Sequence, residues 1–163
     1  MDVSRITPTL LVGSCPRKPQ DAGSLQEVHG VSAVLSLQSE DDLRYWQVDW
    51  ETLCARYREL GITVRRVPIV DFSPDDLRRQ LPRAVQALRE LLDAGGTVFV
   101  HCNAGINRSP SAVIAYLYWH AGWDLLPVVR HVQACRSCDP YLAAIVGATG
   151  DRAKELDEGP PAP

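Results

Sequence analysis

A cysteine and an arginine separated by five residues stand where an apolar segment ends and a helical pattern begins. Cys102 follows the segment TVFVH at residues 97–101, and Arg108 opens the helical pattern. A thiolate at the end of a strand can attack phosphorus, and the planar guanidinium of arginine can bind two phosphate oxygens at once. The pair therefore predicts a phosphoryl-transfer site with Cys102 as the nucleophile and Arg108 as the phosphate clamp.

The residues between the cysteine and the arginine are suited to wrap around an anion. A loop that runs into a helix N-terminus directs several backbone N–H groups toward one point, where they bind phosphate and favour a thiolate. Gly105 permits a tight turn, Ser109 can donate its hydroxyl to the sulfur, and His101 can organise the loop through hydrogen bonds. The predicted phosphate-binding loop comprises His101, Asn103, Ala104, Gly105, Ile106, Asn107 and Ser109.

A cysteine-based phosphatase also needs a general acid that protonates the leaving oxygen and then activates water. The segment VPIVDFSPDD offers three carboxylates, Asp71, Asp75 and Asp76. Asp71 ends an expected strand, so its side chain can reach over a site at the carboxyl edge of a sheet. The other two fall in a first helical turn, where the helix dipole alone explains acidic residues. Asp71 is therefore the preferred general acid, with Asp75 and Asp76 as alternatives.

Strands that alternate with helices must position these residues. Apolar segments bounded by turn residues predict strands at 9–13, 31–37, 62–69 and 97–101. Apolar spacing and capping residues predict helices at 19–28, 49–60, 73–92, 108–120, 124–135 and 139–147. The pattern indicates an α/β fold with a central sheet flanked by helices and a helical C-terminal half.

Length and composition indicate one folded domain over residues 1–150. The chain has 163 residues, of which 45% are hydrophobic and 23% charged, as in ordinary globular proteins. Residues 151–163 are acidic and then proline-rich, which predicts a disordered tail. The net charge of −3 argues against a general nucleic-acid binder, which needs a strongly basic face. No apolar run approaches the ~20 residues of a membrane span.

Cysteine usage predicts a reduced protein. The five cysteines are an odd number, which cannot close a disulfide framework, and the N-terminal sequence lacks the features of a signal peptide. We therefore expect a cytoplasmic protein. Cys135 and Cys138 are interpreted as part of a helix end, because a zinc site would need two more ligands. We expect no metal site.

The motif HCNAGINRS, together with Asp71, resembles the dual-specificity phosphatases of the cysteine-dependent protein tyrosine phosphatase superfamily. The resemblance covers about residues 3–148. Within the superfamily, the chain is most similar to the glucan phosphatases of the laforin and plant starch-excess types. Four stretches carry this closer similarity: LLVGSCPRKPQD, LQSEDDLRYWQVDW, RVPIVDFSPDDLRRQLPRAV and AVIAYLYWHAGWDL.

The resemblance implies a protein tyrosine phosphatase-like fold and hydrolysis of phosphate monoesters without a metal or other cofactor. It assigns the roles of nucleophile, clamp and general acid to the cysteine, the arginine and Asp71. It also implies that Tyr45, Trp46 and Phe72 line an aromatic channel for a glucan chain. Aromatic rings suit this task because they offer rigid contact area to the apolar C–H faces of sugars. The expected substrate is a phosphorylated glucan of the starch or glycogen kind.

Two other functions remain open. A phosphoprotein, dephosphorylated at Tyr, Ser or Thr, is the alternative substrate, and Asn107 favours it because glucan phosphatases usually have glycine before the arginine. A non-catalytic module that binds phosphate or glycan is the second alternative. The complete set of Cys102, Arg108 and Asp71 argues against that module, because binding alone requires no nucleophile. The spacing of cysteine and arginine also occurs in rhodanese-like and arsenate-reductase sites, so the spacing alone does not define the reaction.

Overall fold

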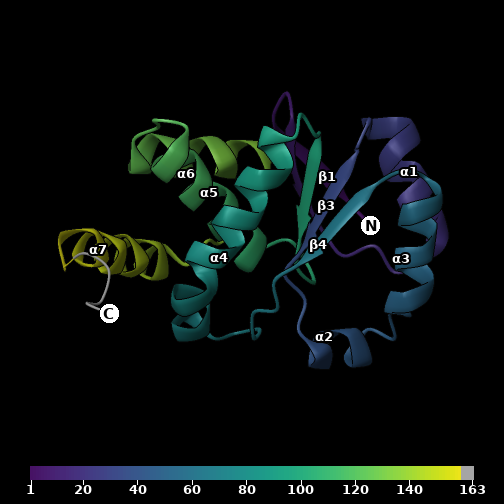
Figure 1. Ribbon diagram of the computed structural model, residues 1–163, viewed down its shortest axis with the longest axis horizontal. Helices are drawn as coiled ribbons and strands as arrows, with labels where there is room; N and C mark the ends of the chain where they lie inside the picture. Colours follow the sequence, from purple (N-terminus) through teal and green to yellow (C-terminus); the bar gives the residue numbers. More distant parts are fainter. Residues whose placement is uncertain (159–163) are drawn as a thin grey trace.

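The computed structural model describes residues 1–158 and contains a five-stranded sheet with helices on both faces (Figure 1). The strands are β1 (Val3–Thr7), β2 (Leu10–Gly13), β3 (Ala33–Ser36), β4 (Thr63–Arg66) and β5 (Val98–His101). They lie in the order β1-β2-β5-β3-β4, with β1 antiparallel to β2 and the other neighbouring pairs parallel. The carboxyl ends of β2, β5 and β3 therefore meet at one edge of the sheet.

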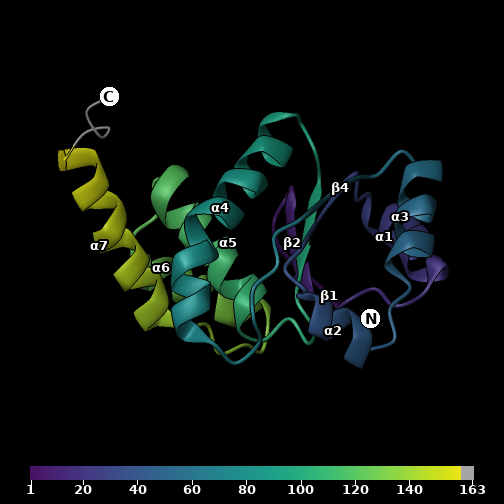
Figure 2. The ribbon, with the colours of Figure 1, turned by 60° about the horizontal axis from the view of Figure 1, so that its bottom comes forward.

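Two groups of helices cover the sheet. The helices are α1 (Pro19–His29), α2 (Glu40–Tyr45), α3 (Trp50–Glu59), α4 (Pro74–Asp93), α5 (Arg108–His120), α6 (Leu125–Cys135) and α7 (Leu142–Glu158). Helices α1 and α3 cover one face, whereas α4 and α5 cover the other, with α6 beside α5 and α7 packed against α4 (Figures 1 and 2). Within the described part of the chain, every helix is too short or too polar to cross a bilayer.

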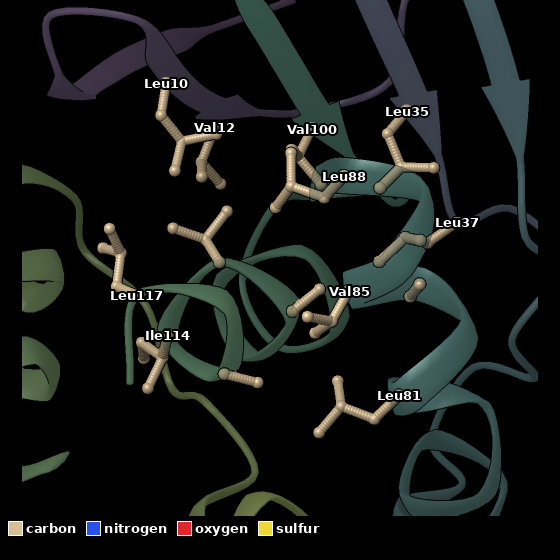
Figure 3. Packing of buried hydrophobic residues seen from close by; sticks show 14 of the residues in the cluster. Leu10, Val12, Leu35, Leu37, Leu81, Val85, Leu88, Val100, Ile114 and Leu117 are labelled. Atoms are coloured by element: carbon tan, nitrogen blue, oxygen red, sulfur yellow. The ribbon is translucent and has the colours of Figure 1, made fainter. Parts of the chain in front are cut away.

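The central strands bury apolar side chains on both faces. Leu10 and Val12 of β2 and Val100 of β5 pack with α4 and α5, as Figure 3 shows. Leu11 and Phe99, which alternate with them along the same strands, pack instead with α1 and α3. Parallel strands covered on both faces appear in sequence as continuous apolar runs. Because the residues that face both sides of the sheet are apolar, these strands can be recognised in the sequence as continuous apolar segments.

The predicted α/β class is confirmed, and each of the four predicted strands is present. Strand β4 is shorter than predicted, since it ends at Arg66. The structure adds two elements that the sequence did not predict, β1 and α2. Strand β1 is a partly exposed edge strand, and α2 has only six residues. Neither element contains the long apolar pattern on which such predictions depend.

The C-terminal helix departs from the prediction. The prediction of a disordered tail from residue 151 is wrong for residues 151–158, which continue α7. Arg78 of α4 pairs with Asp151 at 2.7 Å through both its Nε and its Nη2. This contact spans 73 residues of sequence, so the local composition does not reveal it. The rest of the predicted tail, 159–163, lies outside the described residues.

His101, the last residue of β5, is buried in its neutral form. Its Nδ1 lies 3.1 Å from the backbone oxygen of Cys102, and its ring stacks on Phe99. Burial lowers the pKa of His101 from 6.5 to about 4, and the nearby positive charge of Arg108 acts in the same direction. Between these two pH values the unfolded chain binds a proton at this histidine that the folded chain does not.

We expect the free energy of unfolding to fall as the pH decreases from 6.5 to about 4, with up to about 3 kcal/mol of the loss due to His101. Denaturant titrations across this range measure the effect. His101→Asn, whose amide can replace the Nδ1 contact, should remove this part of the pH slope. His29→Asn, at a half-buried histidine of α1, should retain it. Equal slopes for the wild type and His101→Asn would contradict the prediction.

Candidate active site

The loop at 102–107 joins β5 to α5 at the carboxyl edge of the sheet. It packs against the end of β2, where the backbone N–H of Cys15 donates to the oxygen of Asn103 at 2.8 Å. Gly105 has a φ of +69°, and a Cβ added there would lie 2.4 Å from the backbone oxygen of Gly13. The loop therefore needs glycine at this position for its backbone conformation and for close packing.

Cys102 lines a pocket of about 470 Å³ and is only 3% exposed. The Ser109 hydroxyl lies 3.4 Å from the Cys102 sulfur and donates to it, which is the contact expected from the sequence. A second thiol, Cys15, is buried beside the loop, and burial raises its pKa to about 11. Cys15 therefore stays protonated at neutral pH.

Arg136, at the end of α6, braces the loop from outside the pocket. Its Nε donates to the oxygen of Gly105 at 2.6 Å, and its Nη2 donates to the oxygen of Ala104 at 2.8 Å. The same Nη2 pairs with Asp2 at 3.0 Å. Because the C=O and N–H of a trans peptide point in opposite directions, the N–H groups that follow these two carbonyls point away from Arg136. This contact is not evident from the sequence, where the segment from Cys135 to Cys138 is interpreted only as a helix end.

Arg108 is almost completely buried, and its guanidinium contacts two carboxylates. Nη1 donates to Asp42 at 2.6 Å and to the backbone oxygen of Ile69 at 2.7 Å. Nη2 lies 2.9 Å from a carboxylate oxygen of Asp71. Nε is buried without a hydrogen-bond partner among the described residues, and Nη2 makes no well-aligned hydrogen bond in addition to this ion pair. The guanidinium is thus held at one end and has unused donors at the other.

Asp42 is the second functional residue that the sequence analysis missed. It caps α2 together with Ser39, whose backbone N–H donates to the carboxylate at 2.8 Å. Asn103 donates to it at 2.6 Å. Burial alone would raise the pKa of Asp42, but the hydrogen bonds from Arg108, Asn103 and Ser39 outweigh this and lower it. The serine and aspartate three residues apart are a capping-box signal that could have located α2, although not the contact with Arg108.

Asp71 is the member of the predicted acidic trio that lines the pocket. Its carboxylate accepts from Asn103 at 2.9 Å and lies beside Arg108. Asp76 instead accepts from the backbone N–H of Val70 at 2.8 Å and takes part in the first turn of α4. Asp75 is exposed in the same turn. The geometry favours Asp71 as the acid that reaches a bound substrate.

Aromatic side chains surround the same pocket. Tyr45 and Phe72 are 80% and 82% exposed, and both line it together with Trp46. The rings of Tyr45 and Trp46 meet edge to face with centroids 5.4 Å apart, and Arg17 lies 5.0 Å from the centre of the Trp46 ring. Phe72 has a φ of +54°, an uncommon conformation for a bulky residue. The structure therefore brings the three predicted aromatic residues together with Cys102.

The outer part of the loop is held by the segment after α6. The backbone N–H of Asp139 donates to the oxygen of Ile106 at 2.9 Å, and the Asn107 amide donates to the oxygen of Asp139 at 2.7 Å. Every residue of the predicted phosphate-binding loop therefore lies in or directly beside the loop between β5 and α5. In residues 1–158, no three His, Cys, Asp or Glu side chains converge as metal ligands would.

Comparisons with known proteins agree with this geometry. The family model for the dual-specificity phosphatase catalytic domain matches residues 13–139. Phosphoglucan phosphatase DSP4 of Castanea sativa is 37% identical over 149 residues, which cover 90% of this chain and 39% of that protein. Mouse laforin is 37% identical over 146 residues, covering 83% and 44%. Phosphoglucan phosphatase LSF1 of Arabidopsis thaliana is 33% identical over 159 residues, covering 98% and 27%.

The chain spans less than half the length of these three relatives. Solved structures agree with the fold. The crystal structure of PTPMT1 superposes with a TM-score of 0.76 at 22% identity and covers 97% of this chain and 100% of its own. A human tyrosine phosphatase-like serine/threonine/tyrosine-interacting protein superposes with a TM-score of 0.73 at 23% identity, covering 94% and 97%. The matched domain, the sequence relatives and the shared fold show that the chain belongs to the dual-specificity phosphatase catalytic domain family.

Proposed function

We propose that this protein hydrolyses phosphate monoesters through a phosphocysteine intermediate and that its substrate is a phosphorylated glucan. The observation that carries the proposal is the convergence of Cys102, Arg108 and Asp71 on one pocket with exposed aromatic side chains at its rim. A binding module would need the arginine and the loop, but it would not need a thiol and a carboxylic acid at the same point.

In the first step, the Cys102 thiolate attacks phosphorus and the bond between phosphorus and the sugar oxygen breaks. Asp71 gives its proton to that oxygen, so the glucan leaves as a neutral alcohol. The Nε and Nη2 edge of Arg108, with the loop N–H groups, binds the equatorial phosphate oxygens as charge spreads over them. The substrate is thereby held in line with the sulfur.

In the second step, water attacks the phosphocysteine and the S–P bond breaks. Asp71, now ionised, takes a proton from the water, and inorganic phosphate forms. The Ser109 hydroxyl, 3.4 Å from the sulfur, stabilises the departing thiolate by a hydrogen bond. The cycle returns Cys102 as a thiolate and Asp71 as an acid.

The rim of the pocket and the relatives support a glucan as the substrate. The backbone of Phe72 has a left-handed φ, and its bulky ring is exposed. Functional sites tend to retain such costly conformations. Two of the relatives are phosphoglucan phosphatases by name. Asn107, which departs from the glycine usual in glucan phosphatases, directs its amide to the backbone oxygen of Asp139. Because the Asn107 amide is turned toward Asp139, its presence in place of glycine argues less strongly against a glucan substrate.

A phosphoprotein is the second candidate substrate, since the matched domain belongs to dual-specificity phosphatases. The same pocket and the same chemistry would serve it. We propose the cytoplasm as the compartment, because the five cysteines are all free thiols.

Phosphate release from phosphorylated amylopectin, a phosphotyrosine peptide and an aryl phosphate tests the proposal. We expect the purified protein to act on amylopectin at a rate comparable with the aryl phosphate, and Cys102→Ser to abolish all turnover because its hydroxyl is a far weaker nucleophile. Activity confined to the peptide and the aryl phosphate would favour the phosphoprotein alternative. Turnover by Cys102→Ser near the wild-type rate would contradict the covalent mechanism.

Asp71→Asn should lower kcat on the order of 10²-fold, since an amide cannot supply the proton. The loss should be larger for glucan than for an aryl phosphate, because a sugar alkoxide is the poorer leaving group. The decline of kcat at high pH, where the acid loses its proton, should also disappear. Asp75→Asn, at the exposed neighbour, serves as the control and should retain the wild-type profile. The same changes in Asp75→Asn and none in Asp71→Asn would overturn the assignment.

Tyr45→Ala and Phe72→Ala should each raise the KM for glucan about tenfold, the equivalent of one lost aromatic contact. Both should leave the KM for an aryl phosphate nearly unchanged, because both side chains are exposed at the rim. Val28→Ala, at a 72% exposed residue of α1, is the control for loss of exposed apolar surface. Trp46→Ala belongs to the same series but also removes packing with the core. An equal rise in KM for both substrates would show that the rim does not contact the glucan.

A further inference from the structure

The two ends of the Arg108 guanidinium differ in their hydrogen-bond partners. Nη1 has three acceptors: Asp42 at 2.6 Å and the backbone oxygens of Ile69 and Leu37 at 2.7 and 3.5 Å. On the opposite edge, Nε is buried without a hydrogen-bond partner among the described residues, and Nη2 lies 2.9 Å from an Asp71 oxygen without a well-aligned hydrogen bond. An unpartnered buried donor is costly, so its retention requires an explanation. The Nε and Nη2 edge is the one that can bind two oxygens of one phosphate.

Asp42 is itself fixed from three sides. Its Oδ1 accepts from Asn103 at 2.6 Å, and its Oδ2 accepts from the Ser39 N–H at 2.8 Å as well as from Arg108. The residue is only 6% exposed. A carboxylate with this many donors is stable in its charged form, and it cannot turn without losing them. Asp42 is therefore a rigid and permanently charged anchor.

We propose that Asp42 is a positioning residue for phosphate binding: it holds Nη1 of Arg108 so that the Nε and Nη2 edge faces the phosphate. The inference rests on the proposed function, in which that edge binds the equatorial oxygens. Without Asp42, the guanidinium keeps two backbone acceptors, and Asp71 becomes its only carboxylate partner. Phosphate would then compete with Asp71, which already lies 2.9 Å from Nη2, for a guanidinium held less firmly at its Nη1 end.

Asp42 also separates the roles of the two carboxylates around Arg108. Asn103 donates from one amide nitrogen to both of them, at 2.6 Å to Asp42 and 2.9 Å to Asp71. Two carboxylates that share one donor and one cation do not ionise independently, and the one with more donors keeps its charge. Asp42 is fixed by its three donors and is buried, so Asp71, which lines the pocket, is the carboxylate placed to reach the leaving group. Tyr141 also lies within electrostatic range of Asp71, and the Cys102 thiol lines the same pocket.

Binding of inorganic phosphate to Cys102→Ser tests the proposal directly, by calorimetric titration without turnover. Adding Asp42→Ala to this variant should weaken phosphate binding about thirtyfold or more, as expected when a buried charge pair loses one partner. Adding Asp42→Asn, which keeps the shape and loses the charge, should weaken it less. Adding Glu40→Gln is the matched control: this carboxylate of α2 is exposed, lies outside the pocket and pairs with Arg66, so phosphate binding should stay within about twofold.

Kinetics on an aryl phosphate separate positioning from a purely structural role. In Asp42→Asn, KM should rise, and the decline of kcat at high pH should begin at a lower pH, because Asp71 loses a neighbouring negative charge while its contact with Arg108 remains. Asp42→Glu, which restores the charge, should recover part of both. Thermal unfolding of every variant checks that the protein remains folded.

Two outcomes would overturn the inference. If Cys102→Ser binds phosphate and the folded Asp42 variants bind it equally well or more tightly, Asp42 does not position Arg108, and the proposed function is unaffected. If Cys102→Ser itself binds no phosphate, the pocket is not a phosphate site, and the proposed function fails together with the inference.

Discussion

The Arg108 guanidinium is part of a residue that is only 1% exposed, and a buried charge without acceptors would cost several kcal/mol. Its acceptors come from two segments that are distant in sequence, 37–42 after β3 and 69–71 after β4. Both segments must lie against the loop between β5 and α5 before the arginine can be buried. Satisfying this one charge therefore brings the proposed general acid and the aromatic rim to the cysteine.

The order of the strands makes this convergence possible. Strand β5 lies between β2 and β3, and all three are parallel, so the segments that follow them leave the sheet at the same edge. Open parallel sheets bind their ligands at this edge, where neighbouring connections diverge. The apolar clusters on the two faces of the sheet keep the strands in register, and they leave the polar chemistry to the connections. The core and the pocket are thus built from separate sets of residues.

The parts of the site that are contiguous in sequence could be predicted, and the parts that act through long-range contacts could not. Cys102 and Arg108 belong to one strand, loop and helix, and Asp71 follows a recognisable strand. Asp42 contacts Arg108 across 66 residues, and Arg136 contacts Gly105 across 31. A capping pattern at α2 announces the start of a helix, but it does not reveal which distant cation the same carboxylate will meet.

The bracing of the loop has a consequence for how the protein folds. Arg136 joins the carbonyl groups of Ala104 and Gly105 to Asp2, which lies 134 residues away in sequence. Contacts of such long range form late, because the entropy of closing a large loop must be overcome first. The final shape of the anion-binding loop therefore requires both ends of the domain to be in place. A change near the start of the chain, far in sequence from Cys102, would therefore reach the backbone that faces the phosphate.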